Sequence, residues 1–362
     1  MDDTQATGGT AGDRDLAEAL CARVAEADAS GMPIHITGGG TKAFFGRPVD
    51  GANLDVTGHR GITHYDPVEL VVSVRAGTPL RELEDVLAAA GQQLPFEPPH
   101  FGSGATVGGM IATGLSGPRR PWSGAVRDFV LGIRVITHQG RQLRFGGEVM
   151  KNVAGYDLSR LMTGALGTLG VITEVSLKVL PKPAASHSLC LQLPLANAMA
   201  KLTKWGQQPM PLSAAGWHDG RLYLRLEGGI RSVAANRARL GGEDLDPAFW
   251  TALREHTLPF FGRTDPRPLW RLSLPHHTPP LDLAADVLYD WAGAQRWLRS
   301  DLAASAIREA AARAGGHAAC YTPGAAEPFS RLTPVLAKYH RQLKARLDPN
   351  GIFNPGRMYA EF

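Results

Sequence analysis

Apolar and polar positions along the chain follow two periods, which predict strands and helices in alternation. Residues 171–180 alternate strictly, with Val171, Thr173 and Val175 on one face, and this is typical of a strand. Residues 15–29 place Leu16 and Leu20 one helical turn apart and predict a helix. Further strands are predicted at 32–37, 70–75, 131–137, 188–193, 221–226 and 270–274. Further helices are predicted at 196–205, 232–240, 247–256, 303–314 and 332–347, and at 78–91, where Thr78 caps the helix, Pro79 begins it and Gly91 ends it. The mixture predicts an α+β fold.

Glycine is distributed unevenly and suggests where the chain divides. Residues 1–183 hold 28 of the 42 glycines, so the first half is rich in tight turns and close backbone approaches. Pro181-Lys182-Pro183 marks the point where glycine becomes sparse. We therefore expect a cofactor domain over residues 1–183, followed by a smaller α+β domain.

Composition and charge exclude several classes of protein. A hydrophobic fraction of 44% and a charged fraction of 20% are ordinary for a globular protein, and no apolar run approaches the ~20 residues of a membrane span. The acidic, polar residues 1–15 are unlike a secretory signal, so we expect a cytoplasmic protein. Cys21, Cys190 and Cys320 are too scattered for a disulfide framework, an Fe–S site or a zinc-thiolate site. The net charge of +4 is spread thinly, which argues against nucleic-acid binding, and Arg119-Arg120 is interpreted as a solvated turn.

The first glycine-rich loop, Thr37-Gly38-Gly39-Gly40-Thr41-Lys42, directly follows a predicted strand. Consecutive backbone N–H groups that point into one concavity bind a dinucleotide pyrophosphate well. The string also matches G-x-G-x-x-A, but Rossmann glycines open a helix and residues 44–48 are not helical in pattern. No G-K-[ST] follows, which excludes a Walker A motif. A plain turn is the alternative that a triple glycine always leaves open.

A second stretch, residues 98–124, carries seven glycines between positions 102 and 124, interleaved with small polar side chains. Such a backbone suits close wrapping around a flat ligand, although a turn-rich β domain has the same composition.

A third block carries a family resemblance. Lys151-Asn152-x-x-Gly155-Tyr156-Asp157-Leu158 and Gly167-Thr168-Leu169-Gly170-Val171-Ile172-Thr173, together with the two loops, resemble the vanillyl-alcohol-oxidase (PCMH) type of FAD-binding domain. The tail Phe353-Asn354-Pro355-Gly356 resembles the segment that returns to the flavin domain in lactate and glycolate dehydrogenases. Residues 97–100, 117–124, 145–152 and 351–359 narrow the resemblance to the E subunits of bacterial glycolate oxidases (glycolate dehydrogenases), over about residues 34–362.

The resemblance implies a PCMH-type, two-subdomain FAD-binding domain over residues 1–183, a cap over 184–325 and a C-terminal helix and tail over 326–362 that pack back on the FAD domain. It also assigns cofactor-binding residues. Those that would bind FAD are Thr37, Gly38, Gly39, Gly40, Thr41 and Lys42 at the pyrophosphate, Thr106, Gly108, Gly109 and Ile111 in the second cradle, Gly124 and Asp128 along the flavin or ribityl chain, Val171 and Ile172 by their backbone, and Asn354 and Arg357 toward the isoalloxazine. Some relatives attach the flavin to a histidine where this chain has Thr41, so we expect non-covalent FAD. His35, within the strand, is expected to be structural.

Substrate chemistry has less support in the sequence. Oxidising a 2-hydroxy acid needs an arginine for the carboxylate, a base for the hydroxyl proton and a flavin that accepts hydride. Many relatives carry a His-x-Gly-Asp-Gly-Asn-x-His string in the cap, and this chain has none, so we expect no metal site. His276-His277 and His317 are interpreted as structural or exposed. His100, beside the second cradle, and Lys151 remain the candidates for contact with substrate or flavin.

Three functions remain open on this basis. The first is the FAD subunit of a multi-subunit glycolate dehydrogenase, which would oxidise glycolate, with D-lactate as a second candidate substrate. Its partners would be a larger FAD subunit and an Fe–S subunit, and it would reach a membrane only through them. The second is a structural or electron-relay subunit, which the missing cap histidines favour, and the third is a free-standing flavin oxidase. We expect the purified chain to be yellow but not to be bleached by glycolate or D-lactate.

Overall fold

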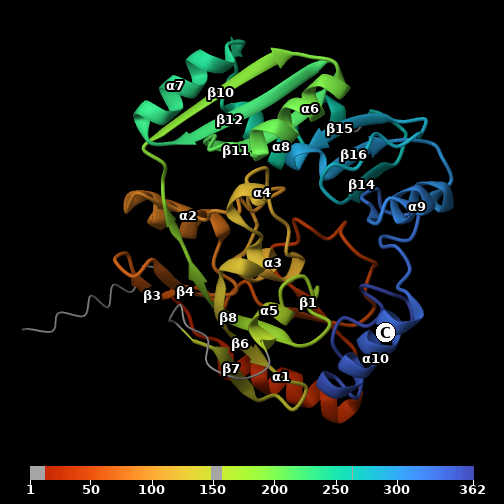
Figure 1. The fold of residues 1–362 in the computed structure, drawn as a ribbon. Helices are drawn as coiled ribbons and strands as arrows, with labels where there is room; N and C mark the ends of the chain where they lie inside the picture. The colour runs from red at the N-terminus through yellow and green to blue at the C-terminus, as the bar shows by residue number, and fades with distance from the viewer. Residues whose placement is uncertain (1–12, 148–156, 263) are drawn as a thin grey trace, which may run out of the picture.

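Two antiparallel sheets organise the molecule, one above the other in Figure 1. The computed structural model describes residues 13–147, 157–262 and 264–362. Helices and strands are mixed along both halves, which confirms the predicted α+β class. No helix in these described ranges is long and apolar enough to cross a membrane.

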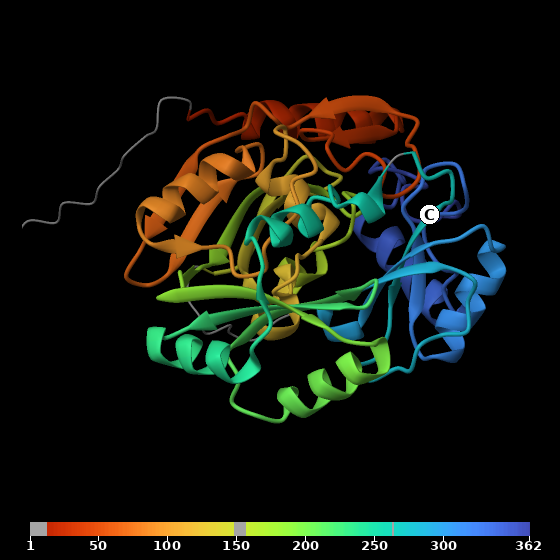
Figure 2. The same ribbon diagram turned by 90° about the horizontal axis from the view of Figure 1, so that it is seen from above.

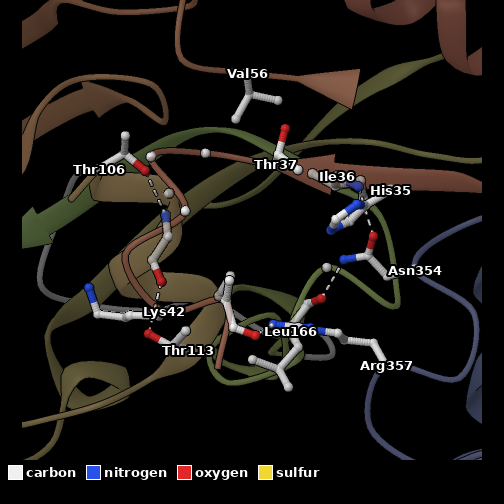
Figure 3. Close-up of a pocket in the computed structure, with 18 of the residues that line it drawn as sticks. His35, Ile36, Thr37, Lys42, Val56, Thr106, Thr113, Leu166, Asn354 and Arg357 are labelled. Carbon is white, nitrogen blue, oxygen red and sulfur yellow. Dashed lines mark hydrogen bonds between the residues drawn. The ribbon is translucent and has the colours of Figure 1, made fainter. Parts of the chain in front are cut away.

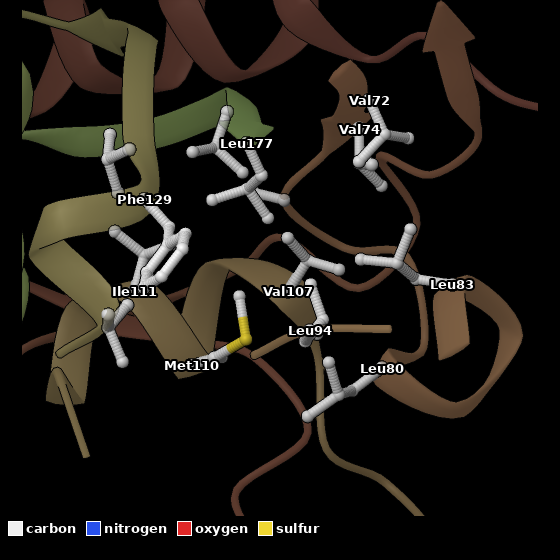
Figure 4. Packing of buried hydrophobic residues seen from close by; sticks show 14 of the residues in the cluster. Val72, Val74, Leu80, Leu83, Leu94, Val107, Met110, Ile111, Phe129 and Leu177 are labelled. Carbon is white, nitrogen blue, oxygen red and sulfur yellow. The ribbon is translucent and has the colours of Figure 1, made fainter. Parts of the chain in front are cut away.

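The lower sheet has five strands in the order β3-β4-β8-β6-β7. The strands are β3 (Ile62–Asp66), β4 (Val71–Arg75), β6 (Val130–Ile136), β7 (Gln142–Gly146) and β8 (Val171–Lys178). The helices of this part are α2 (Leu80–Ala89), α3 (Val107–Thr113), α4 (Arg120–Ser123) and α5 (Leu158–Leu161). Figure 4 shows the core, in which Val72, Leu177 and other sheet residues meet Leu83 of α2 and Met110 of α3. This core holds the start of α3, and with it the second glycine-rich stretch, in place.

A smaller layer joins the two ends of the chain. Its elements are α1 (Ala17–Ser30) and the parallel pair β1 (Ile34–Thr37) and β2 (Ala52–Asp55), while the pair β5 (Gln92–Gln93) and β9 (Leu180–Pro181) lies apart from it. The C-terminal tail follows α10 (Pro334–Leu347), and Phe353 of the tail forms a bridge with Ile34 of β1. Leu20 and Val24 of α1 share one apolar cluster with Ile352 and Phe353. The tail is therefore built into the layer that carries the first glycine-rich loop.

The upper sheet has eight strands in the order β13-β10-β12-β11-β15-β16-β14-β17. The strands are β10 (Ala185–Gln192), β11 (Leu212–His218), β12 (Arg221–Gly228), β13 (Glu243–Asp244), β14 (Leu269–Ser273), β15 (Asp286–Asp290), β16 (Gln295–Arg299) and β17 (His317–Cys320). The helices are α6 (Leu195–Gly206), α7 (Ile230–Leu240), α8 (Ala248–Arg254) and α9 (Ala304–Arg313). Figure 2 shows α6 and α7 on one side of β10 and β12, with α8 on the other.

The face of the upper sheet that carries α8 packs on the lower part of the molecule. Phe45, Leu115 and Leu166 from the lower part share one buried cluster with Trp250 of α8 and Trp297 of β16. The two sheets thus enclose an apolar layer between them, which positions the segments around residues 45 and 115 under the cap. The exact division into domains at residues 183 and 325 stays a prediction.

One local expectation was wrong. Thr78 does not cap α2, because its hydroxyl accepts a hydrogen bond from the Gly61 N–H at 2.9 Å and the helix begins at Leu80 without a side-chain cap. Gly91 takes φ +70 just after the helix, as expected of a terminating glycine. The contact with Gly61 is between segments far apart in sequence, so the local pattern could not reveal it.

Candidate cofactor site

A cavity of about 360 Å³ lies where the loop after β1, the start of α3 and the C-terminal tail meet (Figure 3). We call it the glycine pocket. Its lining residues are His35–Ala43, Pro48, Val49, Val56, Thr106, Gly108, Gly109, Ala112, Thr113, Leu166, Gly167, Gly170, Ile172, Asn354 and Arg357. Both glycine-rich stretches and the tail, which are far apart in sequence, therefore contribute to one cavity.

The first loop supplies the anion-binding groups of the pocket. None of the backbone N–H groups of residues 38–42 donates a hydrogen bond within the part of the chain that the structure describes. All five of these residues line the pocket. A row of unpaired N–H groups around a concavity suits the oxygens of a pyrophosphate, so the residues present fit a dinucleotide here.

The glycines of this loop are required by the protein as well as by a ligand. A Cβ on Gly39 would lie 1.5 Å from the carbonyl oxygen of Gly104, and a Cβ on Gly38 would lie 2.7 Å from Oγ1 of Thr106. The first loop is therefore pressed against the second stretch. Only glycine permits two backbones to approach this closely.

The second glycine-rich stretch gives the pocket a close-fitting surface rather than hydrogen-bond donors. Thr106 caps α3 by accepting from the Gly109 N–H at 3.2 Å, and the Gly108 N–H donates to the Ala76 carbonyl at 2.7 Å. A Cβ on Gly108 would lie 2.7 Å from the Ala76 side chain. These N–H groups are already used, so this wall of the pocket offers a close, smooth surface.

The tail closes the pocket with two polar side chains. Asn354 is buried; its Oδ1 accepts from the Ile36 N–H at 2.8 Å and its Nδ2 donates to the Leu166 carbonyl at 2.7 Å. Arg357 donates to the Phe45 carbonyl at 2.8 Å. Burial lowers the pKa of Arg357. Both side chains line the pocket as expected and at the same time fasten the tail to the loop.

Lys42 is the buried cation of the pocket wall. Its Nζ donates to the His100 carbonyl at 3.2 Å, and its residue is 8% exposed. Burial lowers the pKa of Lys42 to about 8, although Glu255 opposes this shift. Lys42 thus carries most of its charge at neutral pH beside the loop of free N–H groups.

Four predicted binding residues do not line the pocket. Ile111 lies in the core of the lower sheet and Val171 in the cluster around α1, both fully buried. Gly124 and Asp128 lie in the turn before β6, where Asp128 accepts from the Ala125 N–H at 2.8 Å. The structure does not bring these four residues together with the others, and their contact with a cofactor stays a prediction.

The two candidates for contact with substrate or flavin are placed differently. His100 is buried, its Nε2 lies 3.0 Å from Glu84, and it does not line the glycine pocket. Lys151 falls outside the residues that the structure describes. Thr41, which stands where some relatives have a histidine, lines the pocket, and so does His35, whose pKa is lowered by burial and by Arg357.

A buried charge network beneath the cap was not indicated by any sequence pattern. Arg119 was interpreted as part of a solvated turn, but it is 9% exposed and lies 2.8 Å from Glu227. Glu97 lies 2.8 Å from Arg225 and 3.4 Å from Arg119. That interpretation was wrong because Glu227, which pairs with Arg119, lies on β12, more than 100 positions along the chain.

Two more cavities lie between the cap sheet and the lower part. The outer cavity, of about 830 Å³, is lined by Thr41, Phe44, Phe101, Gly102, residues 255–257, Phe261, residues 265–267, Leu269, Arg299 and residues 321–323. The recess, of about 20 Å³, is lined by Pro99, Phe101, residues 115–118, residues 253–254, His256, Arg271, Asp290, Gln295, Trp297 and Tyr321. Thr41 lines both the glycine pocket and the outer cavity, and Phe101 lines both the outer cavity and the recess. The three spaces therefore lie next to one another. Sequence motifs did not indicate the cap residues of these cavities.

Three histidines of the cap were interpreted from the sequence as structural or exposed. His276, His277 and His317 are exposed, and Nδ1 of His277 lies 3.1 Å from the Thr203 hydroxyl. Within the described ranges, no group of three or more His, Cys, Asp or Glu side chains is arranged to hold a metal ion.

Comparisons with known proteins agree with this geometry. A family model described as "FAD binding domain" matches residues 16–146. Glycolate oxidase subunit GlcE of Escherichia coli (strain K12) is 55% identical over 96% of this chain and 98% of its own length. D-lactate dehydrogenase of Archaeoglobus fulgidus is 33% identical over 52% of this chain and 42% of its own length. An alkyldihydroxyacetonephosphate synthase structure, 17% identical, superposes with a TM-score of 0.66 over 93% of this chain and 74% of its own.

The FAD-binding family match and the glycine pocket define a flavoprotein whose cofactor is FAD. Within that class, the chain belongs to the family of glycolate oxidase subunit GlcE, because the match runs from end to end of both chains. The resemblance noted in the sequence is therefore confirmed.

Proposed function

We propose that this chain is the FAD-binding subunit of a multi-subunit glycolate oxidase (glycolate dehydrogenase), an FAD-dependent oxidoreductase that acts on the CH–OH group of a 2-hydroxy acid. The observation that carries the proposal is the 55% identity to a glycolate oxidase subunit across 98% of that protein. The glycine pocket, with its free N–H groups, supports it because it suits a dinucleotide. Glycolate is the substrate of the complex, and D-lactate is a further candidate.

FAD supplies the two-electron acceptor when it is bound. The chain's own residues hold it without a covalent bond, since Thr41 offers no ring nitrogen for attachment. The N–H groups of residues 38–42 and the Lys42 ammonium would bind the phosphates, while Gly108 and Gly109 would give the flat wall. Asn354 and Arg357 hold the tail against the pocket.

The partners we propose are a larger FAD-containing glycolate oxidase subunit and an Fe–S subunit that passes electrons onward. A relative of the first kind, glycolate oxidase subunit GlcD of Bacillus subtilis, is 34% identical over 44% of this chain. The complex would lie in the cytoplasm and reach a membrane through its partners. We further propose that residues 1–183 and the tail from 326 form the FAD domain and that residues 184–325 form the cap.

The test is reconstitution of the complex with and without this chain. Glycolate-dependent reduction of a dye is expected only when the chain is present and loaded with FAD. A chain carrying Gly39→Val is the matched negative control, because its first loop cannot close on Gly104. Full glycolate oxidation by the partners alone would contradict the proposal.

The electron-relay role is the alternative that the missing cap histidines favour. It predicts that the isolated yellow chain is not bleached by glycolate or D-lactate without air. Rapid bleaching of the isolated chain would exclude the relay role and leave the subunit role in place.

A further inference from the structure

We propose that Arg271 binds the carboxylate of a small 2-hydroxy or 2-oxo acid in the recess between the cap sheet and the FAD-binding part. The site is an anion site in the cap, and the substrate class named here rests on the proposed function. It would give this subunit a binding site for substrate or product beside the glycine pocket.

The guanidinium of Arg271 has no counter-ion within residues 13–147, 157–262 and 264–362. It lies on β14, is partly buried, and has no hydrogen-bond or ion-pair partner among the residues that the structure describes. Its Nε is fully buried and unpaired. The cation lies against two aromatic rings, with its Cζ 5.4 Å from the Tyr321 ring centroid and 5.9 Å from that of Phe45. A partly buried arginine with an unpaired buried donor is costly, and an oxygen of a bound carboxylate satisfies such a donor through a charge-assisted hydrogen bond.

The other arginines of the cap interior are committed to the protein. Arg299 donates to the carbonyls of Arg267 and Gly262 at 2.9 and 3.0 Å. Arg254 lies 2.7 Å from Glu255. Arg254, Arg271 and Arg299 line these cavities from α8, β14 and β16. Within the described residues, Arg271 is therefore the one of the three whose donors are available for a ligand.

The acidic and basic neighbours of Arg271 leave its charge uncompensated. Asp290, which also lines the recess, accepts from the Trp291 N–H at 2.7 Å and from Nε2 of Gln295 at 3.0 Å rather than from Arg271. Burial raises the pKa of Asp290 to about 7, so its charge is incomplete at neutral pH. Burial and then Arg271 lower the pKa of His256 to about 3, so this ring is neutral. Arg120, across the interface, has a pKa lowered by burial and by Arg271.

The recess opens toward the cofactor side. Phe101, His256 and Tyr321 line both the recess and the outer cavity, and Thr41 connects the outer cavity with the glycine pocket. The recess has about the space of one water molecule, so one carboxylate oxygen of a small acid enters it and the rest of the acid lies in the outer cavity. Phe101 and His256 take φ +54 and +55, and such backbone strain clusters at ligand sites.

The test is calorimetric titration of the full, FAD-loaded chain with oxalate, in the wild type and in Arg271→Gln and Arg271→Lys. We expect Arg271→Gln to weaken oxalate binding by about 10- to 100-fold, the usual effect of losing a charged hydrogen bond, and Arg271→Lys to restore part of it. The wild type should also bind glycolate more tightly than the uncharged glycolamide, and Arg271→Gln should lose that preference.

Arg296→Gln is the matched control. Arg296 lies on β16 and stacks on Tyr289 with its Cζ 4.9 Å from the ring, but it donates to the Pro279 carbonyl and does not line the recess. This variant should unfold at lower temperature and bind oxalate as the wild type does. Wild-type oxalate affinity in Arg271→Gln, or no oxalate binding by the wild type, would overturn the proposal. Failure of the reconstituted complex to oxidise glycolate would instead contradict the proposed function, so the two failures are distinguishable.

Discussion

The glycine pocket and the cap cavities lie side by side, but they are built from different kinds of residue. The pocket depends on backbone: glycines that let two loops touch, and N–H groups that donate to no group in the part of the chain that the structure describes. The cap cavities depend on side chains, such as Arg271 and His256, that several strands and loops bring together. Backbone sites leave a glycine pattern in the sequence, whereas side-chain sites of this kind leave none.

The largest effect should come from Gly39→Val. The added Cβ would overlap the Gly104 carbonyl, so the two loops must separate and the pocket loses its shape. We expect the chain to purify without FAD, measured as flavin absorbance per chain after gel filtration. Gly91→Ala is the control, because Gly91 has open space around a Cβ and takes the strained φ +70 far from the pocket. If Gly39→Val keeps its FAD, the pocket does not depend on backbone contact and the comparison fails.

Glu97→Gln should destabilise the junction between cap and lower part by about 3 kcal/mol, since it removes one of the two carboxylates that balance the buried Arg119 and Arg225 and leaves them only Glu227. Urea unfolding at pH 7 measures this. The control is Glu327→Gln, which removes an exposed ion pair with Arg47 and should cost no more than about 1 kcal/mol. Equal losses of unfolding free energy in the two variants would show that the buried charge network does not hold the cap on the lower part.

The same carboxylate predicts a pH dependence. Burial alone would raise the pKa of Glu97, but Arg225 and Arg119 together lower it below its usual 4.5. A carboxyl with a lowered folded-state pKa stabilises the fold above its unfolded pKa, and this contribution is lost as the pH falls through the folded value. Wild-type unfolding free energy should therefore drop below about pH 4.5 more steeply than that of Glu97→Gln.

Asn354→Ala should have a smaller effect, about 2 kcal/mol, because it leaves the Ile36 N–H and the Leu166 carbonyl without partners. FAD should dissociate faster, which the recovery of flavin fluorescence measures. Asn350→Ala is the control in the same tail, where the side chain is exposed and bonds only Asp28 at 2.9 Å. Unchanged FAD release in Asn354→Ala would separate the tail from the pocket.

The smallest effect should be a change in FAD affinity with pH, caused by deprotonation of Lys42. Its pKa near 8 means that the ammonium loses its proton as the pH rises past that value, and the attraction for phosphate falls. The dissociation constant for FAD should rise a few-fold between about pH 7 and pH 9. Lys42→Arg, which stays charged, should remove the dependence, and a dependence that persists in it would assign the titration to another group.

The sequence predicted the cofactor side of the molecule better than the cap. The strand before Gly38, the strand from Val171 and the return of Asn354 were all expected, because glycine loops and strict alternation are local signals. The roles of Glu97 and Arg119 could not be expected, since their partners are set by long-range packing. Several strands were missed on both sides, namely β2, β3 and β7 of the lower part and β11, β15, β16 and β17 of the cap. Strand β16, for example, is buried at all five positions and shows no alternation.

The central claim is that FAD binds non-covalently in the glycine pocket. Its most direct test is acid precipitation of the gently purified chain, followed by an absorption spectrum of the supernatant. The structure predicts a yellow protein that releases its flavin into the supernatant, identified there as FAD. Flavin that stays with the pellet would contradict non-covalent binding. A preparation that is reproducibly colourless would contradict the pocket itself.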